Sequence, residues 1–151
     1  SLLTLLKSAR KKIVPVALKK NIAIKISGKD VKAAIIADEI TNLIIVLFEN
    51  AIKYSPEKSA ILVLLDSTRS EAVLHIRDQG VGIAKEDLPY IFDRFYRADT
   101  ARAHEGSSGY GLGLSIAQHI VKKHKGSISV ESEVGKGTNF IVRIPKKQSL
   151  S

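Results

Sequence analysis

Hydrophobic residues recur every three or four positions in three parts of the chain, and this spacing predicts three helices. The first covers residues 2–17, and Pro15 is expected to kink or break it. The second should begin at Asp38, a favourable N-cap, and run to about Tyr54, where a Ser-Pro pair stops it. Its middle is almost wholly apolar, so this helix is expected to be buried. The third should end at Gly126 as its C-cap.

Apolar and polar residues alternate in most of the remaining segments, which is typical of strands. The expected strands cover residues 22–26, 31–37, 60–66, 71–78 and two runs on either side of a turn at 134–137. Residues 22–37 should form a hairpin, and Asp78 should lie where its strand ends. This order of elements predicts an α+β fold, a two-layer α/β sandwich with a mixed sheet and helices on one face.

Length and composition narrow the class of protein. The 151 residues, 44% of them hydrophobic, predict a single domain over residues 1–151 with a real core. There is no cysteine, which excludes disulfides and thiolate chemistry, and no methionine even at position 1, which indicates a processed or excised fragment. The longest apolar run is too short to cross a bilayer. The net charge of +9 favours anionic partners, but aromatic residues are few and lie apart from the basic runs, so nucleic acid is not an expected partner.

A carboxylate and two glycine strings suggest a nucleotide site. Asp78 precedes Gly80 and Gly82, and a second string, Gly109 to Leu114, follows further along the chain. An aspartate at a strand end can accept a hydrogen bond from an exocyclic amine such as that of adenine, while glycines let a backbone approach a ring or a phosphate. The second string opens the third helix, and N–H groups at a helix start can hold phosphates.

Neither glycine string is a common nucleotide fingerprint. Both lack the third glycine of the dinucleotide pattern, and Gly135-Lys136-Gly137-Thr138 departs from the P-loop order and is interpreted as a hairpin turn. Each glycine pair taken by itself favours a tight turn. Their order along the chain and their context favour the nucleotide interpretation instead.

The second helix ends with an amide, an ammonium and an aromatic ring on one face, and these groups suit a metal, a phosphate and a base. With the segments that follow, this helix resembles the ordered N, G1, F and G2 boxes of the catalytic ATP-binding domain of two-component sensor histidine kinases. The four matching segments are Phe48–Pro56, Asp78–Gly82, Ile91–Arg97 and Gly109–Leu114. The resemblance covers essentially the whole chain, including the closing segment Glu131–Thr138, and implies the Bergerat ATP-binding fold.

The resemblance also implies roles for individual residues. Asn50 would help to coordinate Mg²⁺ on the phosphates of ATP, Lys53 would contact phosphate and Tyr54 would pack on adenine. Asp78 would bind the adenine amine. The other nucleotide-binding residues that it implies are Gly80, Gly82, Tyr96, Arg97, Gly109, Gly111, Leu112 and Gly113. Asn50, Lys53 and Arg97 form the implied catalytic set, which acts mostly by positioning and charge neutralisation.

A lid and a set of partners follow from the same resemblance. Residues 98–108 would form the ATP lid, with Phe92 and Phe95 as core anchors at its base. In this family the domain presents ATP to a histidine on a separate helical dimerisation domain, so the expected partners are this phosphoacceptor domain and, indirectly, a response regulator. A cytoplasmic location is expected, with membrane contact only through the parent protein. None of the four histidines here stands in a phosphoacceptor motif, and all four are interpreted as incidental.

One position departs from the family pattern. The family usually has an Asn one turn before Asn50, and the related gyrase and chaperone ATPases have there the Glu that activates water, whereas this chain has Val46. Glu49 lies about 100° around the helix from Asn50 and is a poor substitute. Autonomous hydrolysis is therefore disfavoured. Three functions stay open: a histidine kinase catalytic domain, a nucleotide-binding regulatory module with weak or no transfer, and a serine-directed kinase of the anti-sigma type.

Overall fold

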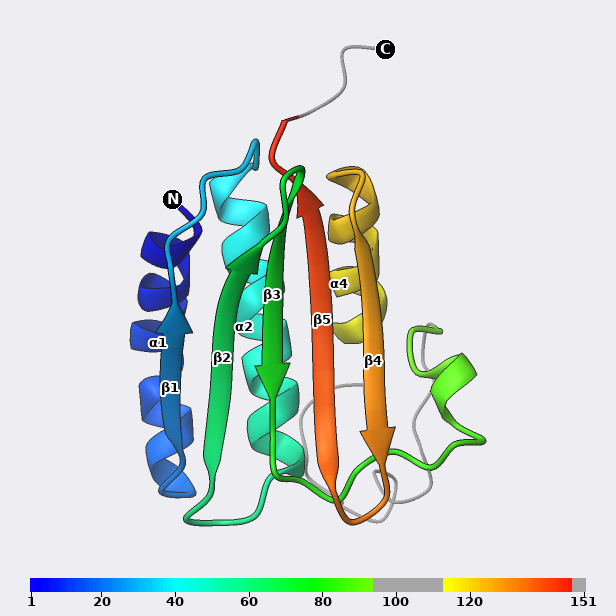
Figure 1. Ribbon diagram of the computed structural model, residues 1–151. Coiled ribbons are helices and arrows are strands. Elements are labelled where there is room, and N and C mark those ends of the chain that lie inside the picture. Colours follow the sequence, from blue (N-terminus) through cyan, green and yellow to red (C-terminus); the bar gives the residue numbers. More distant parts are fainter. Residues whose placement is uncertain (94–112, 148–151) are drawn as a thin grey trace.

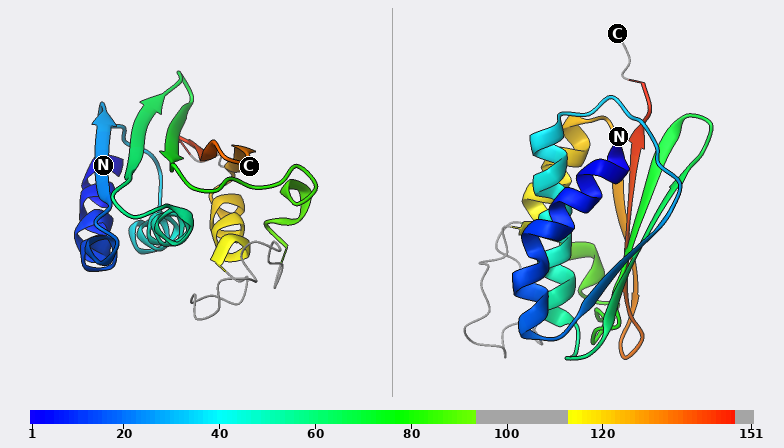
Figure 2. Two further views of the ribbon diagram at one scale, coloured as in Figure 1. Left: turned by 90° about the horizontal axis from the view of Figure 1, so that it is seen from below. Right: turned by 90° about the vertical axis from the view of Figure 1, so that its left-hand side faces the viewer.

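The computed structural model describes residues 1–93 and 113–147. In this part of the chain a five-stranded sheet has the order β1-β2-β3-β5-β4, and the helices pack on one of its faces (Figures 1 and 2). The helical elements are α1 (Leu2–Lys19), α2 (Ala37–Tyr54), the 3₁₀ turn η1 (Leu88–Tyr90) and α4 (Gly113–Lys123). The strands are β1 (Ala23–Gly28), β2 (Ala60–Ser67), β3 (Glu71–Arg77), β4 (Ser127–Glu133) and β5 (Gly137–Pro145).

The sheet is mixed, as the sequence predicts. β1 pairs with β2 in parallel, and the other neighbouring strands are antiparallel. The expected two-layer α+β fold is confirmed, as is the hairpin turn between β4 and β5. No helix of the described residues is long and apolar enough to span a membrane.

The core lies between the sheet and α2, which runs between α1 and α4 (Figure 2, left). The apolar run of α2 is fully buried at Leu43, Ile44, Leu47 and Phe48, as expected for a helix with neighbours on both sides. Burial of such side chains stabilises a fold by roughly 1.5–3 kcal/mol each. This packing fixes the end of α2 relative to the sheet, and the candidate site lies at that end.

The predicted hairpin over residues 22–37 is wrong. β1 forms, but residues 31–36 are extended without being a strand, and the neighbour of β1 is β2. Val31 is buried, and Ala33 and Ile35 are half-buried against the core, so their alternation reflects one-sided burial of a segment that belongs to no strand. A period of two reports which side is buried, not whether a partner strand is present.

Two helix boundaries also differ from expectation. α1 continues through Pro15 to Lys19, held by the buried side chains of Ile13 and Ala17 on either side of the proline. α2 begins at Ala37 with Ile36 at the N-cap position, and Asp38 lies in its first turn, where its charge suits the helix dipole.

A further correction concerns the end of α4. The left-handed residue is Lys125, with φ of 60°, and not Gly126. The Gly126 N–H donates to the Val121 carbonyl and the Lys125 N–H to the Lys122 carbonyl, which is the Schellman pattern. Gly126 is needed for space, because a Cβ there would collide with the carbonyl of Arg143 on β5.

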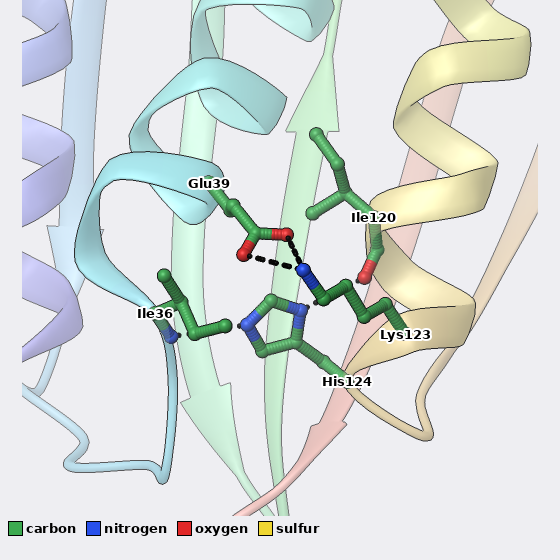
Figure 3. Close-up of polar contacts among 5 residues, drawn as sticks. All are labelled: Ile36, Glu39, Ile120, Lys123 and His124. Carbon is green, nitrogen blue, oxygen red and sulfur yellow. Dashed lines mark hydrogen bonds and ion pairs between the residues drawn. The ribbon is translucent and has the colours of Figure 1, made fainter.

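His124 has a structural role that the sequence did not indicate. It is buried, its Nε2 accepts from the Ile36 N–H at 3.0 Å, and its Nδ1 lies 2.8 Å from the Ile120 carbonyl (Figure 3). One residue earlier, Lys123 forms an ion pair with Glu39 at 3.1 Å. The end of α4 is thereby fastened to the start of α2.

After the Asp78 loop the chain forms the 3₁₀ turn η1, followed by turns up to residue 93. The Phe92 ring packs edge-on against Phe140 of β5, with centroids 6.3 Å apart and an angle of 79° between the rings. Phe92 is therefore an anchor on the core, as predicted. Phe95 lies outside the described residues.

Candidate nucleotide-binding site

Among the described residues, several segments that the sequence analysis singled out meet at one end of the molecule, the lower end in Figure 1. α2 ends there, β3 leads into the segment after Asp78, and β4 turns into β5, whereas α4 begins beside Val46 in the middle of α2. Three segments far apart in the sequence thus contribute to this end, because α2 and β3 run toward it and the β4–β5 turn lies there, while α4 starts further up beside α2 and runs away from it.

Asp78 is held in place by several backbone hydrogen bonds. Its side chain is buried, and Oδ1 accepts from the Gly80 N–H at 2.8 Å and from the Thr138 N–H at 3.1 Å. Its own N–H donates to the Thr138 carbonyl at 2.9 Å. Among the described residues Oδ2 makes no hydrogen bond, so one carboxylate oxygen holds the loop and the other is left for a donor.

Burial raises the pKa of Asp78 above its ordinary value, because an ionised carboxylate is less well solvated there. The hydrogen bonds from Gly80 and Thr138 oppose this effect by stabilising the ionised form, and burial is the larger cause. A carboxylate with a perturbed pKa at a strand end is typical of a binding site.

Glycines after Asp78 let three backbone segments meet. A Cβ at Gly80 would collide with the carbonyl of Tyr54 at the end of α2, and the Val81 N–H donates to the same carbonyl at 3.3 Å. Gly82 has φ of 78° and lies against the carbonyl of Glu133 on β4. The two glycines therefore shape the loop by close approach to α2 and β4.

The β4–β5 hairpin supports this loop from the other side. The Ser132 hydroxyl accepts from the Ile83 N–H at 2.7 Å and lies 2.8 Å from the Thr138 hydroxyl. Thr138 therefore belongs to the site through its backbone bonds to Asp78, although the sequence analysis gave it no role of its own within the turn and the closing segment Glu131–Thr138. The signal that could have found it is the Gly137-Thr138 pair at the start of a strand.

Lys53 and Tyr54 are brought together at the end of α2. The Lys53 ammonium lies 5.3 Å from the centroid of the Tyr54 ring, and both side chains are half-buried. Asn50 is half-buried one turn earlier on the same helix. Lys53 and Tyr54 thus lie in contact with each other at the end of α2, where the Asp78 loop contacts the Tyr54 backbone.

Val46 lies where α2 meets the start of α4. It is half-buried, and a Cβ built on Gly113 would be 3.4 Å from its Cγ1. Val46 and the last glycine of the second string are thus neighbours, one turn before Asn50 on α2. An apolar side chain therefore occupies the place for which the family pattern supplies an amide.

Several predicted site residues lie outside the described residues. They are Tyr96, Arg97, the segment 98–108, Gly109, Gly111 and Leu112. Within the described residues no group of three His, Cys, Asp or Glu side chains could hold a metal ion. An Mg²⁺ ion at this end would need the oxygen of Asn50, waters and the oxygens of a bound phosphate, a donor set that Mg²⁺ accepts.

Comparison with known proteins identifies the class to which this site belongs. The family profile described as "Histidine kinase-, DNA gyrase B-, and HSP90-like ATPase" matches residues 35–148. The sensor protein SrrB of Staphylococcus aureus is 44% identical over 111 residues, which make up 74% of this chain and 19% of that protein. This chain therefore belongs to the histidine kinase-, DNA gyrase B- and HSP90-like ATPase family, as the catalytic ATP-binding domain of a sensor histidine kinase.

Solved structures agree with the fold. The nucleotide-free catalytic domain of histidine kinase ThkA superposes with a TM-score of 0.84 at 25% identity, over 97% of this chain and 95% of that one. A mycobacterial sensor histidine kinase, MprB, gives the same TM-score at 22% identity, over 98% and 96% of the two chains. Family membership supports ATP binding and a kinase or ATPase role. The chain spans about a fifth of the length of the curated relative that it matches.

Proposed function

We propose that this chain binds Mg²⁺-ATP and donates the γ-phosphate to a histidine on a separate helical phosphoacceptor domain of its parent protein. The observation that carries the proposal is the buried Asp78 carboxylate, with Oδ1 fixed by two backbone N–H groups and Oδ2 left for an adenine amine. The contact of the Gly80 loop with the end of α2 supports adenine binding beside Tyr54.

The other roles extend along α2 from this adenine end. Lys53 would contact the phosphates, and Asn50 would supply an oxygen to Mg²⁺, which neutralises phosphate charge when bound. Arg97 and Tyr96 complete the proposed phosphate contacts, and residues 98–108 the proposed lid. The proposed setting is the cytoplasmic part of a sensor kinase, with a response regulator as an indirect partner and membrane contact through the parent protein.

Val46 favours a second candidate function. A valine beside Gly113 offers no oxygen to a metal, which supports a regulatory nucleotide-binding module with weak or no phosphotransfer. Binding is common to both candidates, and transfer distinguishes them.

Labelled ATP tests both candidates. The chain is incubated with ATP labelled at the γ-phosphate, first by itself and then with the phosphoacceptor domain of its parent. We expect acid-labile label on the phosphoacceptor domain and none on this chain. Stoichiometric acid-labile label on the chain by itself would contradict the proposal, and nucleotide binding without transfer would establish the regulatory module. Calorimetry with GTP is the specificity control, because its ring has a carbonyl where adenine has the amine, and equal affinity for ATP and GTP would exclude the Asp78 role.

A further inference from the structure

Lys20, which follows the last residue of α1, donates three hydrogen bonds to the end of α2. Its ammonium lies 2.9 Å from the carbonyl oxygen of Ile52, 3.0 Å from that of Lys53 and 3.2 Å from that of Ser55. An ammonium has three donors, and here all three are directed at one helix terminus. The positive charge also suits the negative end of the α2 dipole.

These bonds complete the hydrogen bonding of the end of α2. The last carbonyls of a helix have no partner within the helix. Lys20 takes those of Ile52 and Lys53 and also the carbonyl of the C-cap residue Ser55, whose own N–H donates to the Ile52 carbonyl at 3.3 Å. The Val81 N–H takes the carbonyl of Tyr54, and the Ser55 hydroxyl takes that of Ala51 at 2.6 Å. The carbonyl of Tyr54, against which Gly80 packs, thus lies between carbonyls that Lys20 holds.

Lys20 is fixed at both of its ends. Its N–H donates to the Ala17 carbonyl at 3.1 Å, and its carbonyl accepts from the Lys58 N–H at 2.9 Å. Its backbone therefore moves with the end of α1, while its ammonium moves with the end of α2. The side chain acts as a strut between the two helices.

We propose that Lys20 is a positioning residue for the nucleotide site and couples the position of α1 to it. The inference rests on the proposed function, since Lys53 and Tyr54 are assigned there to phosphate and adenine. Lys20 holds the carbonyls of Lys53 and Ser55, on either side of Tyr54. It thereby sets the direction of the Lys53 and Tyr54 side chains and the position of the Gly80 loop relative to α2. Loss of its ammonium frees the last turn of α2 and misplaces the adenine end of the site, while Asp78 keeps its own bonds to β5.

The test compares Lys20→Met, which keeps the length of the side chain and removes the ammonium, with Lys19→Met. Lys19 is an exposed neighbour on α1, so its variant has the same loss of charge. ATP affinity is measured by calorimetry at a temperature where urea unfolding shows every variant to be folded. We expect about a tenfold weaker affinity for Lys20→Met and no change for Lys19→Met, since misplacement of binding groups by about 1 Å has effects of this size or more.

Kinetics with the phosphoacceptor domain give a second readout that a loss of stability would not move. KM for ATP should rise in Lys20→Met with little change in kcat, because the adenine end is displaced. Lys20→Arg should be intermediate in affinity, since a planar guanidinium keeps the charge but cannot converge on three carbonyls. If Lys20→Met does not fold, the ATP affinity of Lys20→Arg is the test.

The outcomes separate the inference from the proposed function. If the parent chain binds no ATP, the proposed function fails. If the parent chain binds ATP and a folded Lys20→Met binds it equally well, only the role of Lys20 is overturned. An equal loss in Lys19→Met would assign the effect to net charge and would also overturn it, as would unchanged affinity in Lys20→Arg when the methionine variant does not fold.

Discussion

At the scale of single residues, the ionised carboxylate of Asp78 is expected to strengthen nucleotide binding and to lower the stability of the fold. The pKa of this buried carboxyl is raised in the folded chain, so the folded state holds the proton more tightly than the unfolded state does. Its contribution to the free energy of unfolding is therefore fully present below the ordinary value of 3.8 and is lost as pH rises through the raised pKa. Above the raised pKa, where the carboxyl is ionised, Asp78 lowers the free energy of unfolding relative to its protonated form.

Asp78→Asn should consequently raise the free energy of unfolding at pH 7 and weaken nucleotide binding. The amide oxygen must stay at the Oδ1 position to accept from Gly80 and Thr138, so its NH₂ group takes the Oδ2 position and faces the adenine amine as a second donor. Loss of a charge-assisted bond is worth about 1.5–3 kcal/mol, roughly 10- to 150-fold in affinity.

Urea unfolding across pH, with calorimetry of ATP binding, measures both effects. The stability advantage of the asparagine variant should shrink as pH falls below 3.8, where the native carboxyl is neutral too. If the asparagine variant is less stable than the parent chain at every pH, burial of the ionised Asp78 carboxylate does not destabilise the fold.

Val46 gives a second prediction at this scale. Val46→Asn places an amide beside Gly113 and one turn before Asn50, so Mg²⁺ should strengthen ATP binding more than it does in the parent chain. Val46→Thr is the control, because it keeps the branched shape and adds a polar atom without the reach of an amide. ATP titrations with and without Mg²⁺ on all three proteins isolate the metal effect, and an unchanged magnesium effect in Val46→Asn would place this residue outside the metal shell.

At the scale of elements, the β4–β5 hairpin contains a matched pair of glycines. Gly135 and Gly137 have φ of 84° and 89°, so alanine at either position costs roughly 1–2 kcal/mol of backbone strain. They differ in their surroundings. A Cβ at Gly135 has nothing within 4 Å, whereas one at Gly137 collides with the backbone carbonyl of Asp78.

Gly137→Ala should therefore be less stable than Gly135→Ala and should lose ATP affinity, while Gly135→Ala keeps the affinity of the parent chain. Urea unfolding and calorimetry on the two variants separate backbone strain from displacement of Asp78. Equal affinities in two folded variants would mean that the hairpin does not set the position of Asp78.

Elements held together by local contacts are the ones that the sequence predicts well. α2, the β2–β3 pair and the β4–β5 pair depend on helical spacing or on a short turn, and each is found near its expected place. The prediction of a hairpin over residues 22–37 was wrong because the alternation in residues 31–36 arises from packing on the core. In addition, the pairing of β1 with β2 depends on residues far along the chain. Pro15 in α1 is a similar case, since burial on both sides outweighs a local helix breaker.

The residues of the candidate site likewise fall into those that the sequence predicts and those that depend on the fold. Asp78, Gly80 and Gly82 form one short motif and could be read directly, and the structure explains them by the contacts they make. The bond from the Thr138 N–H to Asp78 had only the Gly137-Thr138 pair as a signal, and that pair does not name its acceptor. Lys20 could not be predicted, because a lysine ammonium has no distinguishing pattern until the fold brings it to its acceptors.

At the scale of the whole molecule, the positive charge is unevenly distributed. Residues 1–34 carry nine basic side chains and one acidic side chain, a net of +8 out of the +9 of the chain. α1 has no acidic residue in its first turn, and its exposed Lys7 and Lys11 are one turn apart. Like charges at this spacing destabilise a helix by about 0.2–0.5 kcal/mol.

Lys7→Glu should raise the free energy of unfolding by roughly 0.4–1 kcal/mol at low salt, because an attractive pair replaces a repulsive one. Lys7→Gln should give about half of this gain. Urea unfolding at low salt and at about 1 M NaCl checks the cause, since the advantage should fade once the charges are screened. A gain that persists in high salt would point to helix propensity instead.

The parallel pairing of β1 with β2 also determines the order in which the molecule can assemble. β2 with β3 and β4 with β5 close across short turns, whereas Ala23 meets Ala60 only after α2 has been placed between them. During synthesis α1 and β1 leave the ribosome before the strand that completes them, and their high charge keeps this waiting segment soluble. Pulsed hydrogen exchange should accordingly find the amides of β1 protected later than those of β3. The hydrogen bonds from Lys20, which precedes β1, to the end of α2 would then form among the last contacts of the fold.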